Sequence, residues 1–428
     1  MPLKFRCDRN SFLNTVTNAN RAVAKQSPLL AALSGLYFEL NGDTLAVTGS
    51  DLDLTITVMT EVAGQESGEA VIPARLLLDV IRVLPVGSLE VTVNHEEAQI
   101  STNSAEFAIK VLPTHDWPNL PLIDTNSLQN MGDGSLLETQ GPEFSENDSD
   151  DPKESNKEQS EKQQSEQPSS AEYSVTTDVS AFRDALSQVV RSASTDDTRP
   201  ILTGILMSSE GDGLRLVSTD SYRLSLRDLP GATLLGEEQQ VLVPGRALNE
   251  LQRMIQSTDK MTLRLSPKIA EFELDKIRLT TRLIEGDFPN YRTLIPQVAE
   301  KDESAGEETD KKDNILTVQR SRLLEAVRRV RLLAQDSTPV IIFASEDNLE
   351  VRADTESIGS ASETIEAQYN GEEISIGFNP AYLIDGLEVS GAEEVTLQLQ
   401  DSLKPALLSP VDDDGFLYLL MPVRIPSG

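Results

Sequence analysis

The sequence predicts an α+β protein built from three homologous domains, each with two helices packed on antiparallel sheet. Two observations lead to this prediction. A short strand, a polar residue and an amphipathic helix follow one another three times along the 428 residues. Each time, alternating strands, a second short helix and further strands follow. The repeat therefore has the length of a domain rather than of a solenoid unit. Two helices are enough to cover one face of an antiparallel sheet.

The first helix of each unit is indicated by apolar residues three or four positions apart, which lie on one buried face. A short strand precedes each helix, at Leu3–Arg6, Tyr173–Thr176 and Ile315–Val318. The predicted helices are Asp8–Val23 with Phe12, Val16, Ala19 and Val23, Asp178–Arg191 with Phe182, Leu186 and Val189 or Val190, and Ser321–Leu333 with Leu323, Val327 and Val330.

The rest of each unit follows in the same order. Alternating apolar and polar residues predict strands within Gly35–Val62, Gly204–Leu226 and Val340–Ile365. The second helices are predicted at Leu76–Leu84, Ala247–Ile255 and Ala381–Leu387. Closing strands are predicted within Ser88–Leu112, Met261–Ile284 and Val395–Arg424.

Two acidic segments separate the units. Residues Ile123–Ser170 are rich in Ser, Gln, Asn, Glu and Asp, and Val298–Asp313 is a shorter acidic connector. A segment such as Glu143–Gln167 cannot bury enough apolar surface to offset its ordering entropy, so it is expected to be disordered. The expected organisation is domain 1 at 1–122, the insert at 123–170, domain 2 at 171–297, the connector at 298–313 and domain 3 at 314–428.

Bulk composition narrows the class of protein. The net charge is −33, which by itself disfavours a nucleic-acid partner. Cys7 is the single cysteine, so no disulfide framework is possible within one chain. The N-terminus has no apolar signal region, and no apolar run approaches the roughly 20 residues of a membrane span. These features predict a soluble cytoplasmic protein.

The predicted helices carry the opposite charge. Basic residues recur in or beside five of the six helices, whereas 381–387 offers Asp385 and no base. This recurrence favours a shared basic surface over separate solvated helix faces. The basic residues are Arg9, Arg21, Lys25, Arg75 and Arg82 in the first unit, Arg183, Arg191, Arg246 and Arg253 in the second, and Arg320, Arg322, Arg328, Arg329 and Arg331 in the third.

Patterns that would indicate catalysis are weak. No phosphate-binding loop of the Walker type occurs. His115-Asp116 is framed by prolines and is interpreted as a turn. A metal-dependent hydrolase using Asp51 and Asp53, or the cluster Asp412-Asp413-Asp414, is the enzymatic alternative, but the cluster lacks calcium-loop spacing and the pair is typical of a solvated strand face. The expectation is no enzyme, no metal and no cofactor.

The C-terminal run Leu419–Ile425 is apolar where chain ends are usually polar. Pro422 cannot donate to a sheet ladder, which excludes a central strand. Two interpretations remain: an edge strand that leaves Met421, Val423 and Ile425 beside a groove, or a final strand that closes its own sheet.

Four motifs resemble those of one family. Ser218-Thr219-Asp220-Ser221-Tyr222-Arg223-Leu224 resembles the T-D-x-[HYF]-R-L strand of bacterial sliding clamps, the beta subunit of DNA polymerase III. Thr48-Gly49-Ser50-Asp51-Leu52, Asp287-Phe288-Pro289-Asn290-Tyr291-Arg292 and Met421-Pro422-Val423-Arg424-Ile425 resemble three further motifs of that family, in the right order. The similarity spans all three units and excludes only the linkers.

The resemblance implies a processivity factor: a head-to-tail homodimeric ring whose helices face duplex DNA without reading bases. The replicative polymerase, the clamp loader and other proteins with a clamp-binding peptide would dock between domains 2 and 3. The implied peptide pocket is Leu202, Thr219, Ser221, Tyr222, Arg223, Leu224, Pro289, Leu294, Met421, Pro422, Val423 and Arg424. The implied dimer contact is Phe107 and Ile109 against Leu332 and Leu333, and the implied DNA-facing residues are Arg9, Arg21, Lys25, Arg75, Arg82, Arg183, Arg191, Arg199, Arg246, Arg253, Arg322 and Arg329.

The chain departs from the family pattern at several points, among them Thr293, where some members place an arginine, and the second helix of the third unit, which carries no base. The insert 123–170 is much longer than the family's usual connector, and Pro426-Ser427-Gly428 extends past its usual end. A different class of function stays open beside the clamp: an acidic multi-domain adaptor that does not encircle DNA. The two differ in topology, because only a clamp holds circular DNA and releases it when the circle is cut. Such a replication protein is expected in the cytoplasm at the nucleoid.

Overall fold

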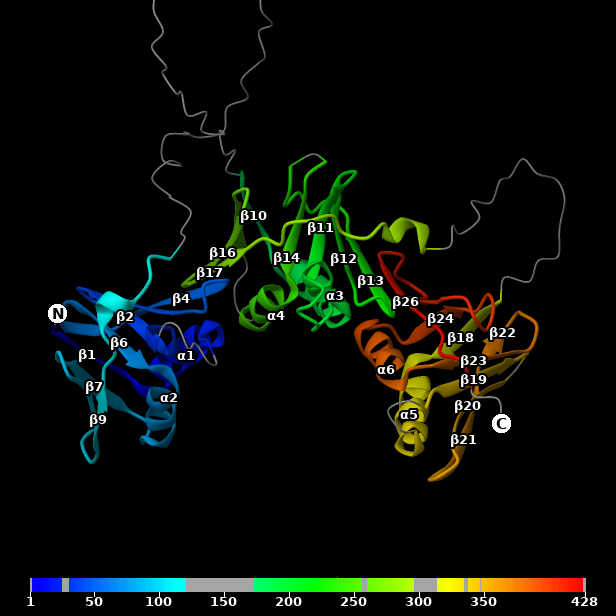
Figure 1. The fold of residues 1–428 in the computed structure, drawn as a ribbon, viewed down its shortest axis with the longest axis horizontal. Coiled ribbons are helices and arrows are strands. Elements are labelled where there is room, and N and C mark those ends of the chain that lie inside the picture. Colours follow the sequence, from blue (N-terminus) through cyan, green and yellow to red (C-terminus); the bar gives the residue numbers. More distant parts are fainter. Residues whose placement is uncertain are drawn as a thin grey trace, which may run out of the picture.

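The computed structural model describes residues 2–24, 31–120, 173–236, 238–255, 260–295, 314–334, 338–346 and 348–425. Three units follow one another in an arch, with the helices on the concave side and sheets toward the convex side (Figure 1). The segments 123–170, predicted to be disordered, and 298–313, predicted to be a linker, lie outside the described residues. Lys25 and residues 426–428 also lie outside them.

The first unit has two α-helices and nine strands. The helices are α1 (Arg9–Ala19) and α2 (Ala74–Val83), and short 3-10 turns are η1 (Asn20–Ala22), η2 (Ala31–Ser34) and η3 (Thr114–Asp116). The strands are β1 (Leu3–Asp8), β2 (Gly35–Asn41), β3 (Thr44–Ser50), β4 (Leu54–Glu61), β5 (Ala63–Glu66), β6 (Gly68–Pro73), β7 (Ser88–Val93), β8 (Glu97–Ser101) and β9 (Glu106–Lys110).

The second unit repeats this order. Its helical elements are α3 (Ser180–Val189), η5 (Val190–Ser192), η6 (Pro200–Thr203), α4 (Gly245–Met254) and η7 (Tyr291–Thr293). Its strands are β10 (Tyr173–Asp178), β11 (Gly204–Glu210), β12 (Gly213–Thr219), β13 (Arg223–Leu229), β14 (Gln240–Pro244), β15 (Lys260–Leu265), β16 (Ile269–Leu274) and β17 (Ile277–Arg282).

The third unit is the same again. Its helical elements are α5 (Arg320–Val330), η8 (Arg331–Leu333) and α6 (Pro380–Val389). Its strands are β18 (Ile315–Gln319), β19 (Val340–Ser345), β20 (Asn348–Thr355), β21 (Gly359–Glu366), β22 (Gln368–Tyr369), β23 (Ile374–Phe378), β24 (Glu394–Gln398), β25 (Ala406–Pro410) and β26 (Phe416–Leu420).

The helices form for the reasons that their sequences suggest. Phe12, Val16 and Ala19 are buried on one face of α1. The Asp8 side chain accepts from the backbone N–H groups of Asn10 and Ser11, which caps this helix. The last residues of each predicted first helix form a 3-10 turn instead, at η1, η5 and η8. The predicted two-helix units are therefore confirmed, with a shorter first α-helix in each unit.

Two of the four sheets cross from one unit into the next. β4 of the first unit pairs with β17 of the second, and β13 of the second pairs with β26 of the third, both antiparallel. This makes an eight-stranded sheet and a nine-stranded sheet, each shared by two units. The remaining five-stranded and four-stranded sheets belong to the first and third units alone. The units are thus joined by backbone hydrogen bonds as well as by the chain.

Each of the two unshared sheets ends in a strand whose outer edge pairs with no other strand among the described residues. β9 is one edge of the five-stranded sheet, and β21 is one edge of the four-stranded sheet. These strands lie at the two ends of the arch in Figure 1. An exposed strand edge presents unpaired backbone groups and is a template for pairing with another chain.

Apolar packing follows the same division. One core runs through the first two units, and a separate core fills the third. A smaller cluster lies on the other face of the nine-stranded sheet and includes Leu206, Leu224, Leu226, Tyr291, Leu407 and Leu419. Among the described residues, no helix combines the length and apolarity needed to cross a bilayer.

Candidate functional site

The turn between β12 and β13 is the centre of the candidate peptide site. One carboxylate oxygen of Asp220 accepts from the backbone N–H groups of Tyr222 and Arg223, at 2.9 and 3.0 Å. This places Ser221 at a φ of 79°, an uncommon conformation for a residue with a side chain. Tyr222 projects from the turn and is 57% exposed. The local sequence Thr-Asp-Ser-Tyr-Arg therefore presents an aromatic ring to solvent on a tightly bonded turn.

The C-terminal tail runs beside this turn. The Met421 N–H donates to the Tyr222 carbonyl at 2.9 Å, and the Val423 N–H donates to the Gly377 carbonyl at 2.7 Å. The second bond is an isolated antiparallel bridge to β23. Leu112 bonds to Val71 and Ile284 to Leu242 at 2.8 and 2.9 Å after the last strands of the first two units. Neither interpretation describes the whole run: Leu419 and Leu420 end β26, which lies between β13 and β25 inside the shared sheet, and residues 421–425 continue beside the edge strand β23.

The segment after β17 forms another side of the site. It crosses the convex side of the sheet toward β26 (Figure 1), and Phe288 and Tyr291 pack with the small outer apolar cluster. Arg292 lies over the Tyr291 ring and pairs with Glu210, which fixes the segment to β11. Leu294 is exposed beyond this anchor.

The predicted pocket residues do not all have the same exposure. Tyr222, Leu294 and Met421 are exposed apolar or aromatic groups. Leu202, Thr219 and Leu224 are buried beneath the surface, and the Thr219 hydroxyl donates to the Arg223 carbonyl at 2.6 Å. Ser221, Pro289 and Arg424 are exposed, and Pro422 and Val423 are half-buried.

The Arg223 side chain differs from the predicted role, because it is 9% exposed and serves the junction between two units. Its guanidinium donates to Asp220 and Asp385 at 3.1 and 2.5 Å, and to the Arg191 carbonyl at 2.5 Å. It also lies 4.4 Å from the Tyr382 ring centre. Burial alone would lower the pKa of Arg223, but Tyr418 and Asp385 outweigh it and the pKa is raised.

Tyr382 is a site residue that sequence reasoning missed. It comes from α6 and its ring stacks on Tyr222, with centroids 6.3 Å apart. The Tyr418 hydroxyl donates to its carbonyl at 2.8 Å. Its position at helical spacing gave only a helix prediction, and no local pattern in the sequence links two residues 160 positions apart.

The concave face carries the predicted basic residues, yet most of them have acidic partners. Arg9 instead donates to the carbonyls of Ile81 and Arg82 at 2.9 and 2.7 Å, which completes the end of α2. Arg75 is exposed and has no ion-pair partner among the described residues. The remaining described members pair as Arg21–Glu250, Arg82–Asp79, Arg183–Asp184, Arg191–Asp385 and Glu388, Arg199–Asp196, Arg246–Asp51, Arg253–Glu250, Arg322–Glu366 and Arg329–Glu363.

Some of these pairs cross between units. Arg21 in η1 meets Glu250 in α4 at 2.8 Å, joining the first and second units. Arg191 in η5 meets Asp385 in α6 at 3.1 Å and also pairs with Glu388, joining the second and third. The Arg191 hydrogen bond lowers the pKa of the Glu388 carboxyl below its ordinary value. The acidic α6 is therefore a junction element rather than part of a uniformly basic surface.

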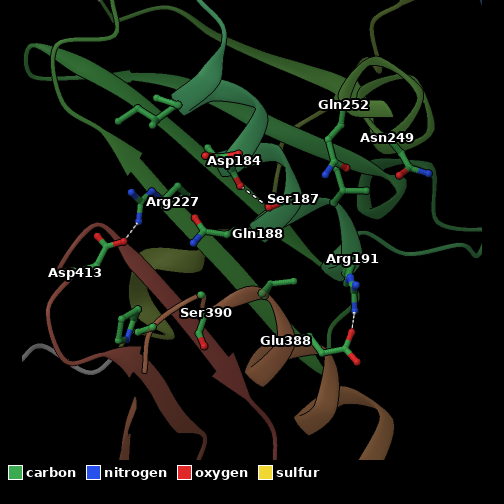
Figure 2. Close-up of a pocket in the computed structure, with 18 of the residues that line it drawn as sticks. Asp184, Ser187, Gln188, Arg191, Arg227, Asn249, Gln252, Glu388, Ser390 and Asp413 are labelled. Atoms are coloured by element: carbon green, nitrogen blue, oxygen red, sulfur yellow. Dashed lines mark hydrogen bonds and ion pairs between the residues drawn. The ribbon is translucent and has the colours of Figure 1, made fainter. Parts of the chain in front are cut away.

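A cavity of about 1190 Å³ opens on this side between α3, α4 and α6. Figure 2 shows Arg191 directed at Glu388 and Arg227 directed at Asp413 across its walls. These charged groups neutralise one another, and the lining holds no His or Cys. The cavity offers no arrangement of nucleophile and base.

Several residues of the enzymatic alternative, Asp51 and Asp413 among them, have structural partners. One oxygen of Asp51 accepts from Leu54 N–H at 2.9 Å, and the other pairs with Arg246. Asp413 pairs with Arg227, and the exposed His115 lies 3.4 Å from Asp116 in η3. No cluster of three potential metal ligands occurs in the described part of the chain.

The predicted dimer residues lie at the two ends of the arch. Phe107 on β9 is 36% exposed and Leu332 in η8 is 79% exposed, while Leu333 is half-buried. Ile109 is only 2% exposed and belongs to the core of its own unit. The Ile109 side chain is therefore packed inside its own unit and is not available for a contact with a second copy.

Comparisons with known proteins cover nearly the whole chain. Family models described as the N-terminal, central and C-terminal domains of the DNA polymerase III beta subunit match residues 3–121, 176–290 and 309–424. The beta sliding clamp of Streptomyces coelicolor is 29% identical over 99% of this chain and 100% of its own. That of Bacillus subtilis is 24% identical with the same coverage.

Solved structures show the same fold. The DNA polymerase III subunit beta of Pseudomonas aeruginosa matches with a TM-score of 0.76 at 24% identity, covering 99% of this chain and 100% of that one. The DNA polymerase sliding clamp of Bacillus subtilis matches with a TM-score of 0.78 at 23% identity, covering 100% of both chains.

Proposed function

The chain belongs to the DNA polymerase III beta subunit family, and from this premise we propose that two copies close head to tail into a ring around duplex DNA. The function of the family is that of a sliding clamp, a non-catalytic processivity factor. The finer points proposed are how the ring closes, which residues face DNA and where partner peptides bind. We also take 1–122, 171–297 and 314–428 as the clamp domains, and expect the protein at the nucleoid.

One observation carries the ring proposal: both junctions inside the chain join equivalent strands in the same register. Ile56 of β4 lies opposite Leu279 of β17, and Ser225 of β13 lies opposite Tyr418 of β26. The equivalent strands left over are β21 at one end of the chain and β9 at the other. A third junction of the same kind can form only between two copies.

The equivalence fixes the register of that third junction. Leu279, Tyr418 and Phe107 lie opposite Phe272, Leu408 and Ile100 in the preceding strands of their own units. In the same way, Ile56, Ser225 and Ala361 lie opposite Gly49, Ser218 and Ala353. Phe107 of one copy is therefore expected opposite Ala361 of the other. This puts Phe107 on the helix side of the new sheet, where Leu332 and Leu333 are available.

The concave helices would face the DNA. Sliding requires contacts that are weak and independent of sequence, and phosphate contacts from long basic side chains have this character. Arg75 is a described candidate that is exposed and has no ion-pair partner among the described residues, and Lys25 and Arg199 are proposed as further DNA-facing residues. Arg residues that are paired across a junction would contribute to the shape of the ring as well as to its charge.

Partner peptides would bind at Tyr222, Leu294 and Met421, which are exposed and lie within a few residues of members of the outer apolar cluster in the chain. Burying a leucine and a phenylalanine there would contribute roughly 1.5–3 kcal/mol each. After ordering costs, an affinity on the order of micromolar is expected. The proposed partners are the replicative polymerase, the clamp loader and other proteins with such a peptide.

Cysteine cross-linking tests the ring and its register. Residues directly opposite in antiparallel strands have Cα atoms about 4.5–5.5 Å apart, within disulfide range. The double variant F107C/A361C should form a disulfide-linked dimer on mild oxidation. The control F107C/S362C should not, because neighbouring residues point to opposite faces of a strand. Burial raises the pKa of the native Cys7 thiol to about 12, so it should not interfere.

The oxidised dimer then distinguishes a clamp from an adaptor. A ring closed on circular DNA should stay bound at high salt and leave after the circle is cut. A protein of monomer mass, equal cross-linking of both cysteine pairs, or equal retention on circular and linear DNA would overturn the ring proposal.

A further inference from the structure

Asp385, in the acidic helix α6, makes two ion pairs that the proposed peptide site does not by itself explain. Asp385 divides its two carboxylate oxygens between two arginines of the preceding unit. One oxygen lies 3.1 Å from Arg191, and the other accepts from Arg223 at 2.5 Å. Arg223 is nearly buried, so its charge depends on these bonds.

The bond between Asp385 and Arg223 lies next to the candidate peptide site. Arg223 follows Tyr222 directly in the chain, and Asp220 bonds to the backbone N–H groups of both residues. The Arg223 guanidinium also returns to Asp220 at 3.1 Å. On the far side of Tyr222, its ring meets Tyr382, and Tyr382 also lies against the guanidinium. Asp385 and Tyr382 are both on α6.

We propose that Asp385 is a positioning residue for the peptide site: by holding Arg223 it fixes the Asp220–Arg223 turn and therefore the orientation of the Tyr222 ring. The inference rests on the proposed function, because it concerns how that same site is kept in shape. Asp385 does not touch the peptide. It acts through Arg223 on the turn that carries Tyr222, which forms one wall of the proposed peptide site.

The chain contains a matched control at its other internal junction. Glu250 is the sixth residue of α4, as Asp385 is the sixth of α6. Glu250 accepts from Arg21, the middle residue of η1, as Asp385 does from Arg191, the middle residue of η5. The turn beside this first junction presents Asp53, paired with Arg282 at 3.9 Å, where the second presents Tyr222. Loss of either carboxylate weakens a junction, but only one junction adjoins Tyr222.

The test compares D385N with E250Q in the full-length chain. Fluorescence anisotropy with a labelled Gln-Leu-x-Leu-Phe peptide gives Kd, and thermal unfolding gives Tm. D385N should raise Kd about threefold to tenfold, the range that a single lost hydrogen bond produces. E250Q should leave Kd within twofold at a temperature where both variants are folded. Equal Kd values for the two variants would overturn the inference.

A double-variant cycle separates positioning from general loosening of the fold. If Asp385 acts through Tyr222, D385N and Y222A together should weaken binding by less than the product of their separate effects. The effects of D385N and L294A on Kd should multiply, because these substitutions alter separate walls of the site. Multiplication in both cycles would overturn the inference. If D385N is too unstable, D385E moves the carboxylate by one methylene, and it is compared with E250D.

The outcome for the wild-type chain stands apart from these comparisons. If wild type does not bind the peptide, the proposed peptide site fails. If wild type binds and D385N binds equally well, the site stands and only the positioning role of Asp385 is lost.

Discussion

Replacing Gly377 should displace the C-terminal tail without opening the ring. Gly377 lies in β23, and its carbonyl accepts the Val423 N–H at 2.7 Å. A Cβ atom added here would lie 2.7 Å from the Val423 oxygen and 3.1 Å from a side-chain carbon of Ile425. Contacts under 3.0 Å to backbone atoms require movement, and the tail is the part of this pair that is held by fewer bonds.

The size of the effect follows from what the tail would lose. The G377V variant should break the bond between Val423 and Gly377, which is worth about 0.5–1.5 kcal/mol. If this full amount is needed to keep Met421 beside Tyr222, peptide affinity should fall roughly twofold to tenfold. The Tm should fall by only a few degrees, because residues 421–425 are not members of the buried core of the third unit.

Peptide anisotropy and light scattering measure the two effects separately. Dimer mass should equal that of wild type, because the proposed contact uses β9 and β21, and β21 is the edge of the four-stranded sheet opposite to β23. The control is G236A, where an added Cβ would meet only the end of a glutamine side chain at 3.4 Å. If G377V binds peptide as tightly as G236A does, the position of the tail does not shape the site.

Two further predictions concern charge. R75E should shorten retention on circular DNA at moderate salt without lowering Tm, whereas R21E should lower both, because it also sets a like charge beside Glu250; equal Tm losses would contradict this separation. The second concerns Glu388, whose carboxyl pKa is lowered by the bond from Arg191. A lowered acid pKa contributes stability above the unfolded-state pKa that is lost as pH falls through the folded-state pKa. The Tm of E388Q should therefore lie below that of wild type at pH 7, and the gap should close on acidification below about pH 4; a gap that widens there would refute the assignment.

Local patterns were sufficient to predict the units. The spacing of Phe12, Val16 and Ala19 places them on one face of a helix, and this face is buried in the structure. The same spacing recurs at Phe182 and at Leu323. Period and order are properties of short stretches, so the sequence alone could predict two helices and several strands three times over.

The connections between units could not be predicted in this way. The bond from Arg223 to Asp385 spans 162 positions, and the stack of Tyr222 on Tyr382 spans nearly as many. No periodicity encodes such pairs, since each depends on how two units meet. For the same reason, arginines such as Arg191 were assigned to DNA by their sign alone. Charge indicated that arginines recur along the helices, but it did not indicate which carboxylates face them.

The difference between internal and closing junctions follows from the task of each. At both internal junctions the middle residue of the 3-10 turn is an arginine, Arg21 or Arg191, with a carboxylate partner in the next unit. The same position in η8 is Leu332, which is the most exposed large apolar residue among those described. An internal junction never separates, because the chain holds both halves, and partly exposed ion pairs can orient it at little net gain in stability. The closing junction must assemble from two separate molecules and must also reopen. Apolar contact supplies affinity there in proportion to the area buried, and it leaves no unpaired buried charge when the partners separate. In the proposed ring, Leu332 and Phe107 would thus stand where a reversible contact is required, and the arginines stand where the chain itself makes the contact permanent.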